Sequence, residues 1–139
     1  MKEKSITLRI VNSTDIHFLF NLLKQRDSRA NISHKKMPTY SEHVKFVKSK
    51  PYSKWYIIHN SRTKIGSIYL SKNNEIGIFL KKEYQGEGFA SKALDLLMKK
   101  NPRSRYLANV NPRNLQSAKF FKKNNFKLIQ HTFELEIMS

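Results

Sequence analysis

The sequence contains no cysteine among its 139 residues. A disulfide scaffold, a thiolate zinc site, an iron–sulfur cluster and a cysteine nucleophile are therefore excluded. Runs of 18 apolar residues are also missing, and the first residues alternate instead of forming the apolar block of a signal peptide. We therefore expect a single domain over residues 1–139, without a membrane span or a metal site, working in the reducing cytoplasm.

Acidic residues are scarce, since 10 Asp and Glu stand against 27 Lys and Arg, which gives a formal net charge of +17. Such an excess favours an anionic partner: nucleic acid, a membrane surface or a phosphorylated ligand. The basic residues are nevertheless spread along the whole chain, with no block of five or six like charges. No helix-turn-helix, zinc-finger, RRM or KH signature is present, so nucleic acid is not the expected partner.

Hydrophobic patterning predicts the secondary structure. Apolar residues alternate over 6–10, which predicts a strand, and recur at helical spacing over 16–23. Thr39 and Glu42 have the spacing of a capping box for a second helix. Further strands are predicted at 55–58, 65–70, 75–80, 106–110 and 126–137, and further helices at 89–100 and 115–123. This order, β-α-α-β-β-β-α-β-α-β, indicates a mixed α/β fold around a single sheet.

Only four glycines occur in the chain, and two of them, Gly86 and Gly88, lie between a predicted strand and a predicted helix. The first N–H groups of a helix have no internal partners and carry partial positive charge, so a helix start can bind phosphate. Glycine lets the backbone approach an anion closely. Two glycines alone also fit an ordinary turn. The glycine motif of a dinucleotide fold and a Walker loop are both absent.

Gln85, Gly88 and Ala90 spell Q-x-x-G-x-A directly after the strand, and this resembles the acyl-CoA-binding signature of the GNAT superfamily of N-acyltransferases. Asn114, opening a helix that leads to Phe126, resembles a second landmark of that superfamily. The element order is similar too, so the resemblance covers about 6–137. It implies a central, mostly antiparallel, splayed sheet flanked by helices, with acetyl-CoA as co-substrate.

The resemblance also implies which residues hold the co-substrate. Main-chain amides from Gln85 to Ala90 would bind the pyrophosphate, with Lys92 or Lys122 assisting. Backbone groups at the end of the preceding strand would hold the pantetheine arm, and an N–H there would stabilise the oxyanion that forms on the thioester. The cofactor-binding residues implied in this way are Phe79, Leu80, Gln85, Gly86, Gly88, Ala90, Ser91 and Asn114, with Leu80 also counted as catalytic.

An amine must be neutral before it can attack a thioester, so a base is expected. Glu75, at the head of the strand, resembles the glutamate that many family members place there, although a solvated edge carboxylate fits equally well. His43 and His34 are alternative bases. Phe121 occupies the position where the superfamily usually has a tyrosine that protonates the leaving thiolate. Ser117, Tyr84 or water would have to take that role.

The acceptor region, 24–56, is similar to a subgroup that acetylates amino groups on nucleotide-activated sugars. Arg26 would contact phosphates, Trp55 would stack on a ring, and His43 would complete the acceptor site. The same three residues could instead be a helix-end charge, a core ring and a surface histidine. Protein or ribosomal N-termini and small amines remain alternative acceptors, and an acyl-CoA or nucleic-acid binder without turnover is an alternative class. A homodimer is left open.

Overall fold

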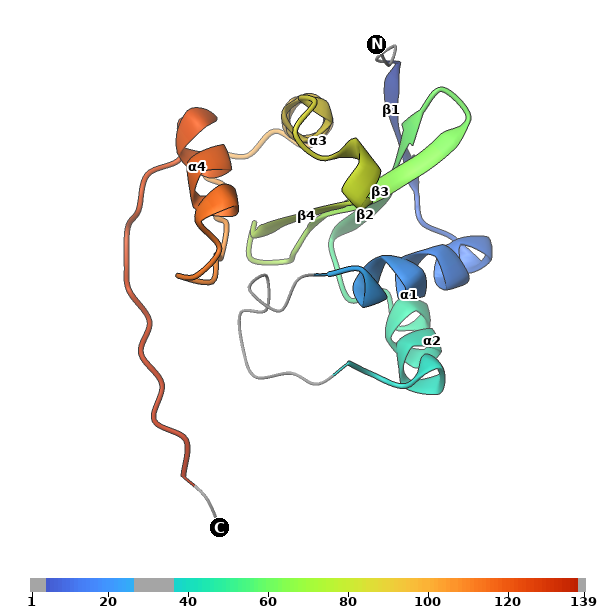
Figure 1. Ribbon diagram of the computed structural model, residues 1–139, viewed down its shortest axis with the longest axis horizontal. Coiled ribbons are helices and arrows are strands. Elements are labelled where there is room, and N and C mark those ends of the chain that lie inside the picture. The colour runs from blue at the N-terminus through green and yellow to red at the C-terminus, as the bar shows by residue number, and fades with distance from the viewer. Residues whose placement is uncertain (1–4, 27–36, 138–139) are drawn as a thin grey trace.

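The computed structural model describes residues 5–26 and 37–137, and its centre is a four-stranded antiparallel sheet (Figure 1). The strands follow one another in the order β1-β2-β3-β4, so that each pairs with its neighbour in sequence. Their bounds are β1 Ile6–Ile10, β2 Lys54–Asn60, β3 Thr63–Leu70 and β4 Ile76–Leu80. The mixed α/β fold with a mostly antiparallel sheet, predicted from the sequence, is confirmed.

Helices cover both faces of the sheet (Figure 1). One face carries the short 3-10 turn η1 and helices α1 and α2, while α3 packs on the other; α4 lies beyond β4. The bounds are η1 Ser13–Asp15, α1 Ile16–Lys24, α2 Tyr40–Lys48, α3 Phe89–Lys100 and α4 Leu115–Lys123. The predicted capping box is confirmed, because the Thr39 hydroxyl accepts from the Glu42 N–H at 3.1 Å and the Glu42 carboxylate accepts from the Thr39 N–H at 2.8 Å.

Alternation along the strands divides the core into two clusters. Ile58 and Tyr56 of β2 point to the face that α3 covers, whereas Ile57 between them packs with α1 and α2. All three side chains are buried. The sheet is therefore apolar on both faces, and the two helical layers are fixed to it independently.

A buried carboxylate fastens the start of α1 to the sheet. Asp15 is fully buried and accepts hydrogen bonds from Arg9 at 2.7 Å and from Lys64 at 2.7 Å. Burial by itself raises the pKa of this carboxyl, but the bonds from Arg9, Lys64 and the Asn12 N–H outweigh it and lower the pKa from 3.8 to about 2. The two ion pairs therefore join β1, through Arg9, and β3, through Lys64, to the residue that directly precedes α1.

The strand predicted at 106–110 is reduced to a single parallel bridge. Leu107 donates its N–H to the Asn74 carbonyl and accepts from the Ile76 N–H at 2.7 Å, and no other residue of this segment joins the sheet. The prediction fails because the chain turns away from β4 after this contact, toward the start of α4. Because the two segments diverge, β4 has no neighbouring strand beyond this bridge on the edge that faces away from β3.

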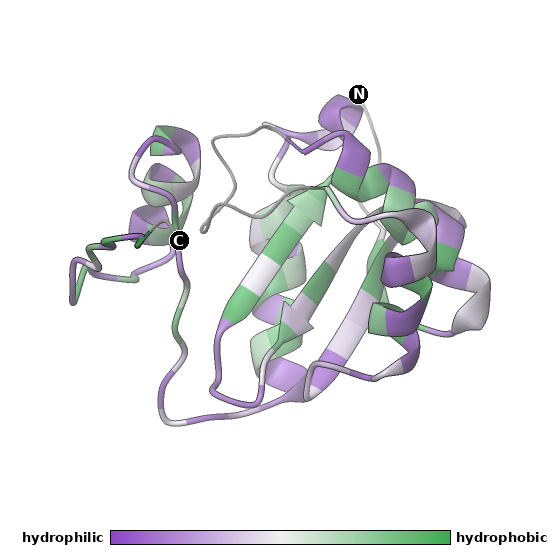
Figure 2. Ribbon diagram, turned by 90° about the horizontal axis from the view of Figure 1, so that it is seen from below, coloured by the Kyte–Doolittle hydropathy of each residue, from purple (hydrophilic) through white to green (hydrophobic). Residues whose placement is uncertain are grey.

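The strand predicted at 126–137 is also absent. This segment runs extended and away from the rest of the molecule in Figure 1; in Figure 2, where it is seen nearly end-on, it lies beside α4 and apart from the sheet, and no described strand pairs with it. Phe126 still packs against the core, but from Leu128 on the apolar side chains are exposed, with Phe133 at 92% and Leu135 at 85%. The period-two pattern is real, but a strand forms only where a neighbouring strand satisfies its backbone groups. The helix end before it is as predicted, since Asn125 has a φ of 72°.

No helix of residues 5–26 and 37–137 is long and apolar enough to cross a membrane. Within the same described ranges, no group of three or more His, Asp or Glu side chains is arranged to hold a metal ion.

Candidate active site

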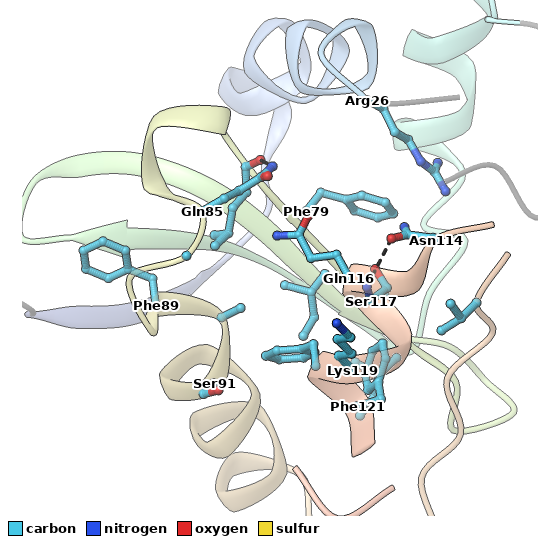
Figure 3. Close-up of a pocket in the computed structure, with 18 of the residues that line it drawn as sticks. Arg26, Phe79, Gln85, Phe89, Ser91, Asn114, Gln116, Ser117, Lys119 and Phe121 are labelled. Atoms are coloured by element: carbon cyan, nitrogen blue, oxygen red, sulfur yellow. Dashed lines mark hydrogen bonds between the residues drawn. The ribbon is translucent and has the colours of Figure 1, made fainter. Parts of the chain in front are cut away.

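A cleft of about 770 Å³ opens where the sheet splays (Figure 3). Its walls are β4, the turn and first residues of α3, the segment 109–111, and α4. Of the predicted cofactor residues, the cleft brings together all eight: Phe79, Leu80, Gln85, Gly86, Gly88, Ala90, Ser91 and Asn114. Residues up to 35 positions apart in sequence therefore meet in one place, at the only edge of β4 that β3 does not cover.

The hydrogen-bond register decides which backbone groups of β4 face the cleft. Ser71 pairs with Glu75 and Ile65 with Lys81, so the odd-numbered residues of β4 bond to β3. The even-numbered residues point to the other edge, where the Ile76 N–H already bonds to Leu107. Leu80 lies on that edge, as the predicted role requires.

Phe79 differs from the expectation, because its backbone groups belong to the pair with Ser67 on β3. Only its side chain lines the cleft. The backbone groups that face the open edge are those of Ile78 and Leu80, and the Leu80 carbonyl accepts a hydrogen bond from the Gln85 side chain at 3.1 Å. Sequence reasoning missed Ile78, although the alternation of backbone direction along a strand places it on the same edge as Leu80.

The turn before α3 has the backbone that the glycine pair suggested. Gly86 and Gly88 have φ values of 78° and 84°, in the left-handed region that favours glycine. Gly88 directly precedes α3, so the positive end of this helix opens on the cleft, where Ala90 and Ser91 of its first turn are lining residues. The Gln85 N–H is not among the open donors, because it bonds to the Lys82 carbonyl at 3.2 Å within the short turn Lys82–Tyr84.

Asn114 closes the cleft from the side of α4. Its side-chain oxygen accepts from the Ser117 N–H at 3.1 Å and caps the helix (Figure 3). Ser117 and Phe121 also line the cleft. Tyr84, a candidate proton donor on sequence grounds, is not a lining residue and packs edge-on against Phe89 instead.

Three lysines line the cleft, and they are not the ones expected. Lys82, Lys119 and Lys123 lie along its wall, whereas Lys92 and Lys122 do not. The reason is helical spacing: positions 119 and 123 are four apart and share the face of α4 that looks at β4, and position 122 does not. Lysines are spread so evenly along the chain that no pattern indicates which of them face inward.

Glu75 lies at the start of β4, just outside the cleft. Its carboxylate accepts hydrogen bonds from Asn109 Nδ2 at 2.6 Å and from the Ser71 hydroxyl at 3.2 Å. Glu75 is not a lining residue, but Asn109 is. Asn109 therefore lies between the Glu75 carboxylate and the cleft. The role of Glu75 as a base stays a prediction.

A second, smaller pocket of about 110 Å³ adjoins the cleft, and it brings together the three predicted acceptor residues, Arg26, His43 and Trp55. We call it the aromatic pocket. It lies between α1, α2 and strands β2 to β4, and it shares Arg26 and Phe79 with the wall of the cleft. The Arg26 guanidinium lies over the Phe79 ring, 4.5 Å from its centroid.

Burial shifts the pKa of both titratable residues of the predicted acceptor site, His43 and Arg26. Burial lowers the pKa of His43, and a hydrogen bond to the Ile16 carbonyl opposes this in part. His43 is therefore neutral at pH 7 and is a core residue of α2, not the surface residue considered as an alternative. Burial likewise lowers the pKa of Arg26, but an arginine so far above neutrality stays charged. His34, the other alternative base, lies outside the described residues.

Solved structures with the same fold are numerous. An acetyltransferase from Thermus thermophilus matches with a TM-score of 0.74 and 16% identity, covering 94% of this chain and 92% of its own. The acetyltransferase from Salmonella typhimurium that modifies the N-terminal serine of a 50S ribosomal subunit protein gives 0.75 and 20%, covering 99% and 89%. The spermidine/spermine N-acetyltransferase of Vibrio cholerae gives 0.72 and 19%, covering 96% and 86%.

A ribosomal α-N-protein acetyltransferase solved in complex with coenzyme A has a TM-score of 0.70 and 20% identity, covering 92% of this chain and 83% of its own. At these identities the likeness shows the fold alone. No curated protein matches the sequence. The model of the acetyltransferase (GNAT) domain, however, matches residues 5–127, which is most of the chain. The protein therefore belongs to the GNAT acetyltransferase family and is an acyltransferase.

Proposed function

We propose that the protein is an acetyl-CoA-dependent N-acetyltransferase that transfers an acetyl group to a primary amine. One observation carries the proposal: the open backbone edge at Ile78 and Leu80 meets the N-terminus of α3 in a single cleft. An unpaired strand edge suits an amide-rich arm, and a helix start suits a diphosphate. Acetyl-CoA contains both parts, joined in one molecule.

The residues of the cleft fit this co-substrate. The first amides of α3, beside Gly88, would bind the diphosphate, and Lys82, Lys119 and Lys123 add positive charge around it. The outward groups of Ile78 would pair with the pantetheine amides. The Asn114 oxygen is used as the helix cap, so its amide nitrogen is the group left to donate to the arm.

When bound, acetyl-CoA supplies an activated thioester. In the transfer, the amine nitrogen forms a bond to the acetyl carbonyl carbon, the carbon–sulfur bond breaks, and the amine loses one proton. The Leu80 N–H is the donor we assign to the carbonyl oxygen as it gains charge. Glu75 would receive the proton by way of water held at Asn109. Phe121 cannot donate a proton, and Ser117 is the hydroxyl of the same helix that lines the cleft.

The acceptor predicted from sequence, the amino group of a nucleotide-activated sugar, remains within this proposal. Protein N-termini and small amines such as polyamines are its alternatives. Proteins named for ribosomal N-terminal and for spermidine acetylation are both similar to this chain in fold, at 20% and 19% identity. The comparisons therefore do not separate the acceptors.

The test is binding of acetyl-CoA followed by turnover. Acetyl-CoA should raise the melting temperature of the whole chain, because a ligand that binds only the native state stabilises it. Gly88→Val should abolish this shift while leaving the far-ultraviolet spectrum unchanged, since Val is strained at a φ of 84°. Gly88→Asn is the control and should keep part of the shift, because Asn adopts the left-handed region more readily. An undiminished shift in Gly88→Val would contradict the assignment.

A further inference from the structure

The aromatic pocket is enclosed by rings that pack on one another. Tyr52 stacks on Tyr69, with ring centroids 3.9 Å apart and planes 5° apart, and it meets Trp55 edge-on at 4.9 Å. Phe46 packs edge-on against both Tyr52 and Trp55. Apolar side chains form much of the remaining wall: Leu19, Leu22, Leu23 and Phe79. The ring contacts hold this wall in place without a ligand, so the shape of the pocket is preformed.

Two uncharged polar atoms of the pocket residues are buried and have no hydrogen-bond partner among the described residues: Trp55 Nε1 and His43 Nε2. The indole N–H can only donate. The imidazole is neutral at pH 7, and its other nitrogen donates to the Ile16 carbonyl, so His43 Nε2 carries a lone pair and can only accept. These two atoms therefore offer one uncharged donor and one uncharged acceptor.

The donor and the acceptor belong to the same part of the wall. His43 and Phe46 are three positions apart on α2 and therefore share one face of that helix. The Phe46 ring in turn contacts the Trp55 ring, with centroids 6.0 Å apart. His43 and Trp55 thus lie on either side of Phe46. Leaving a buried donor and a buried acceptor unpaired costs free energy, so a group that satisfies both is favoured over a group that satisfies neither.

The size of the pocket limits what enters it. A volume of about 110 Å³ holds a group as large as roughly three to four water molecules at about 30 Å³ each. A hydroxymethyl group or a carboxamide fits within that volume, and a whole sugar or nucleotide does not. The pocket shares Phe79 and Tyr69 with the wall of the cleft, so the rest of the acceptor would extend into the cleft toward the thioester.

From these observations we infer that the aromatic pocket binds an uncharged end of the acceptor, which accepts a hydrogen bond from Trp55 Nε1–H and donates one to His43 Nε2. A hydroxyl and a carboxamide both do this, whereas an ether oxygen only accepts and a methyl group does neither. The inference rests on the proposed function and names its substrate class: amines that carry a hydroxyl or a carboxamide at the end remote from the reacting nitrogen.

Matched amines test the substrate class. Release of free thiol from acetyl-CoA would be measured with amino alcohols from ethanolamine to aminopentanol, each against the alkylamine in which a methyl replaces the hydroxyl, and with β-alaninamide against isoamylamine, which has the same branched shape. The polar member of at least one pair should have a kcat/KM about tenfold or more above its apolar partner. The methyl ether of the best amino alcohol should fall between them. The two kinds of pair show whether a hydroxyl or a carboxamide is preferred. Equal rates within every pair, or a preference for the apolar members, would overturn the inference.

Two variants test the named atoms. Trp55→Phe keeps a ring but removes the N–H, and it should lower the preference for the polar amine about tenfold through its KM, leaving the KM for acetyl-CoA unchanged. His43→Phe removes the acceptor and should do the same. Tyr56→Phe is the matched control, because it removes a polar ring group from the next residue of β2, on the opposite face of the sheet, and it should keep the preference. Comparing the preference between variants cancels the difference in basicity between the amines. An equal loss with both members of a pair would indicate a packing role and overturn the assignment.

A direct binding measurement separates this inference from the proposed function. Trp55 is the only tryptophan in the chain, so a proton–nitrogen correlation spectrum contains a single indole N–H resonance. At least one polar amine of the pairs should shift this resonance at a concentration at which its apolar partner does not, and His43→Phe should weaken that binding about tenfold. A normal acetyl-CoA melting shift, together with a resonance that no polar amine moves more than its partner, would show that water alone satisfies Trp55 and would overturn only the pocket assignment. Loss of the acetyl-CoA shift would overturn the proposed function itself.

Discussion

At the scale of single residues, Asp15 shows how a buried charge holds two layers of the molecule together. Its carboxylate is fully buried, and its two cationic partners come from β1 and β3. Such a group stabilises the fold only while it is ionised and paired. No pattern in the sequence indicates these ion pairs, because the partners of Asp15 are 6 and 49 positions away.

Asp15→Asn should lower the free energy of unfolding by about 2 kcal/mol at pH 7, as expected for a carboxyl whose pKa is about 2 when folded and 3.8 when unfolded. Because the folded pKa is the lower one, this contribution is complete above pH 4 and is lost as pH falls toward 2. Urea unfolding at pH 7 and pH 2.5 would measure it. Asp95→Asn, which breaks an exposed pair with Lys99, is the control and should change little at either pH. A difference that does not shrink at low pH would contradict the assignment.

Glu75 offers the second prediction at this scale. Glu75→Gln should lower kcat about 100-fold at neutral pH and much less at high pH, where the amine loses its proton without help. A pH profile of thiol release would measure this. Asn109→Ala should give a profile similar to that of Glu75→Gln, because Asn109 lies between that carboxylate and the cleft. Equal activity of Glu75→Gln at all pH values would remove Glu75 from the mechanism.

At the scale of elements, β4 determines the site. The backbone groups of its odd-numbered residues pair with β3, whereas those of its even-numbered residues face the open edge, where a ligand can bind. The sequence predicted the strand, the turn and the helix in the right places, because each is determined by local patterning. It did not predict which backbone groups stay open, because that depends on where the neighbouring segment leaves the sheet.

Gly77→Ala tests whether the Tyr69 ring of β3 must lie directly against Gly77 of β4. The added Cβ would meet the Tyr69 ring at 2.2 Å, so the ring must move. We expect a loss of about 1–3 kcal/mol in unfolding free energy, as for other overpacked sites, and a higher KM for the acceptor, since Tyr69 walls the aromatic pocket. Gly86→Ala has no such neighbour within 4 Å, so any loss it causes comes from its φ of 78° alone, and it separates backbone strain from overpacking. An unchanged acceptor KM in Gly77→Ala would show that Tyr69 does not shape the pocket.

At the scale of the whole molecule, the segment 128–137 is the feature without a place in the core, since Phe126 before it still packs against the core. It alternates apolar and polar residues, and its apolar side chains are exposed to an extent that is unusual for a single chain. A strand of this kind pairs readily with another sheet edge. It therefore bears directly on the homodimer that the sequence left open.

We expect the full chain to self-associate and a chain ending at Lys127 to be monomeric. The shortened chain should keep its unfolding free energy within about 0.5 kcal/mol, since exposed residues contribute little to stability. Sedimentation over a range of concentrations would measure association, and urea unfolding would measure stability. A full chain that is monomeric throughout, together with a large loss of stability on shortening, would show instead that the segment folds back on its own chain.

The sequence by itself determined the helices, the four sheet strands, the glycine turn and the family resemblance, because these follow from periodicity and from a short local motif. The sequence also indicates Arg26, His43 and Trp55, which the structure brings to one pocket, and Leu80, which lies at the open edge of β4; the roles of these residues stay predictions. Only the tertiary structure decided that Ile78 and not Phe79 offers its backbone, that Gln85 has its N–H occupied, and which lysines face the cleft. Strand register and helix orientation arise from contacts between segments distant in the chain, whereas the Gln85 N–H bonds within a short turn whose closure no hydrophobic pattern encodes.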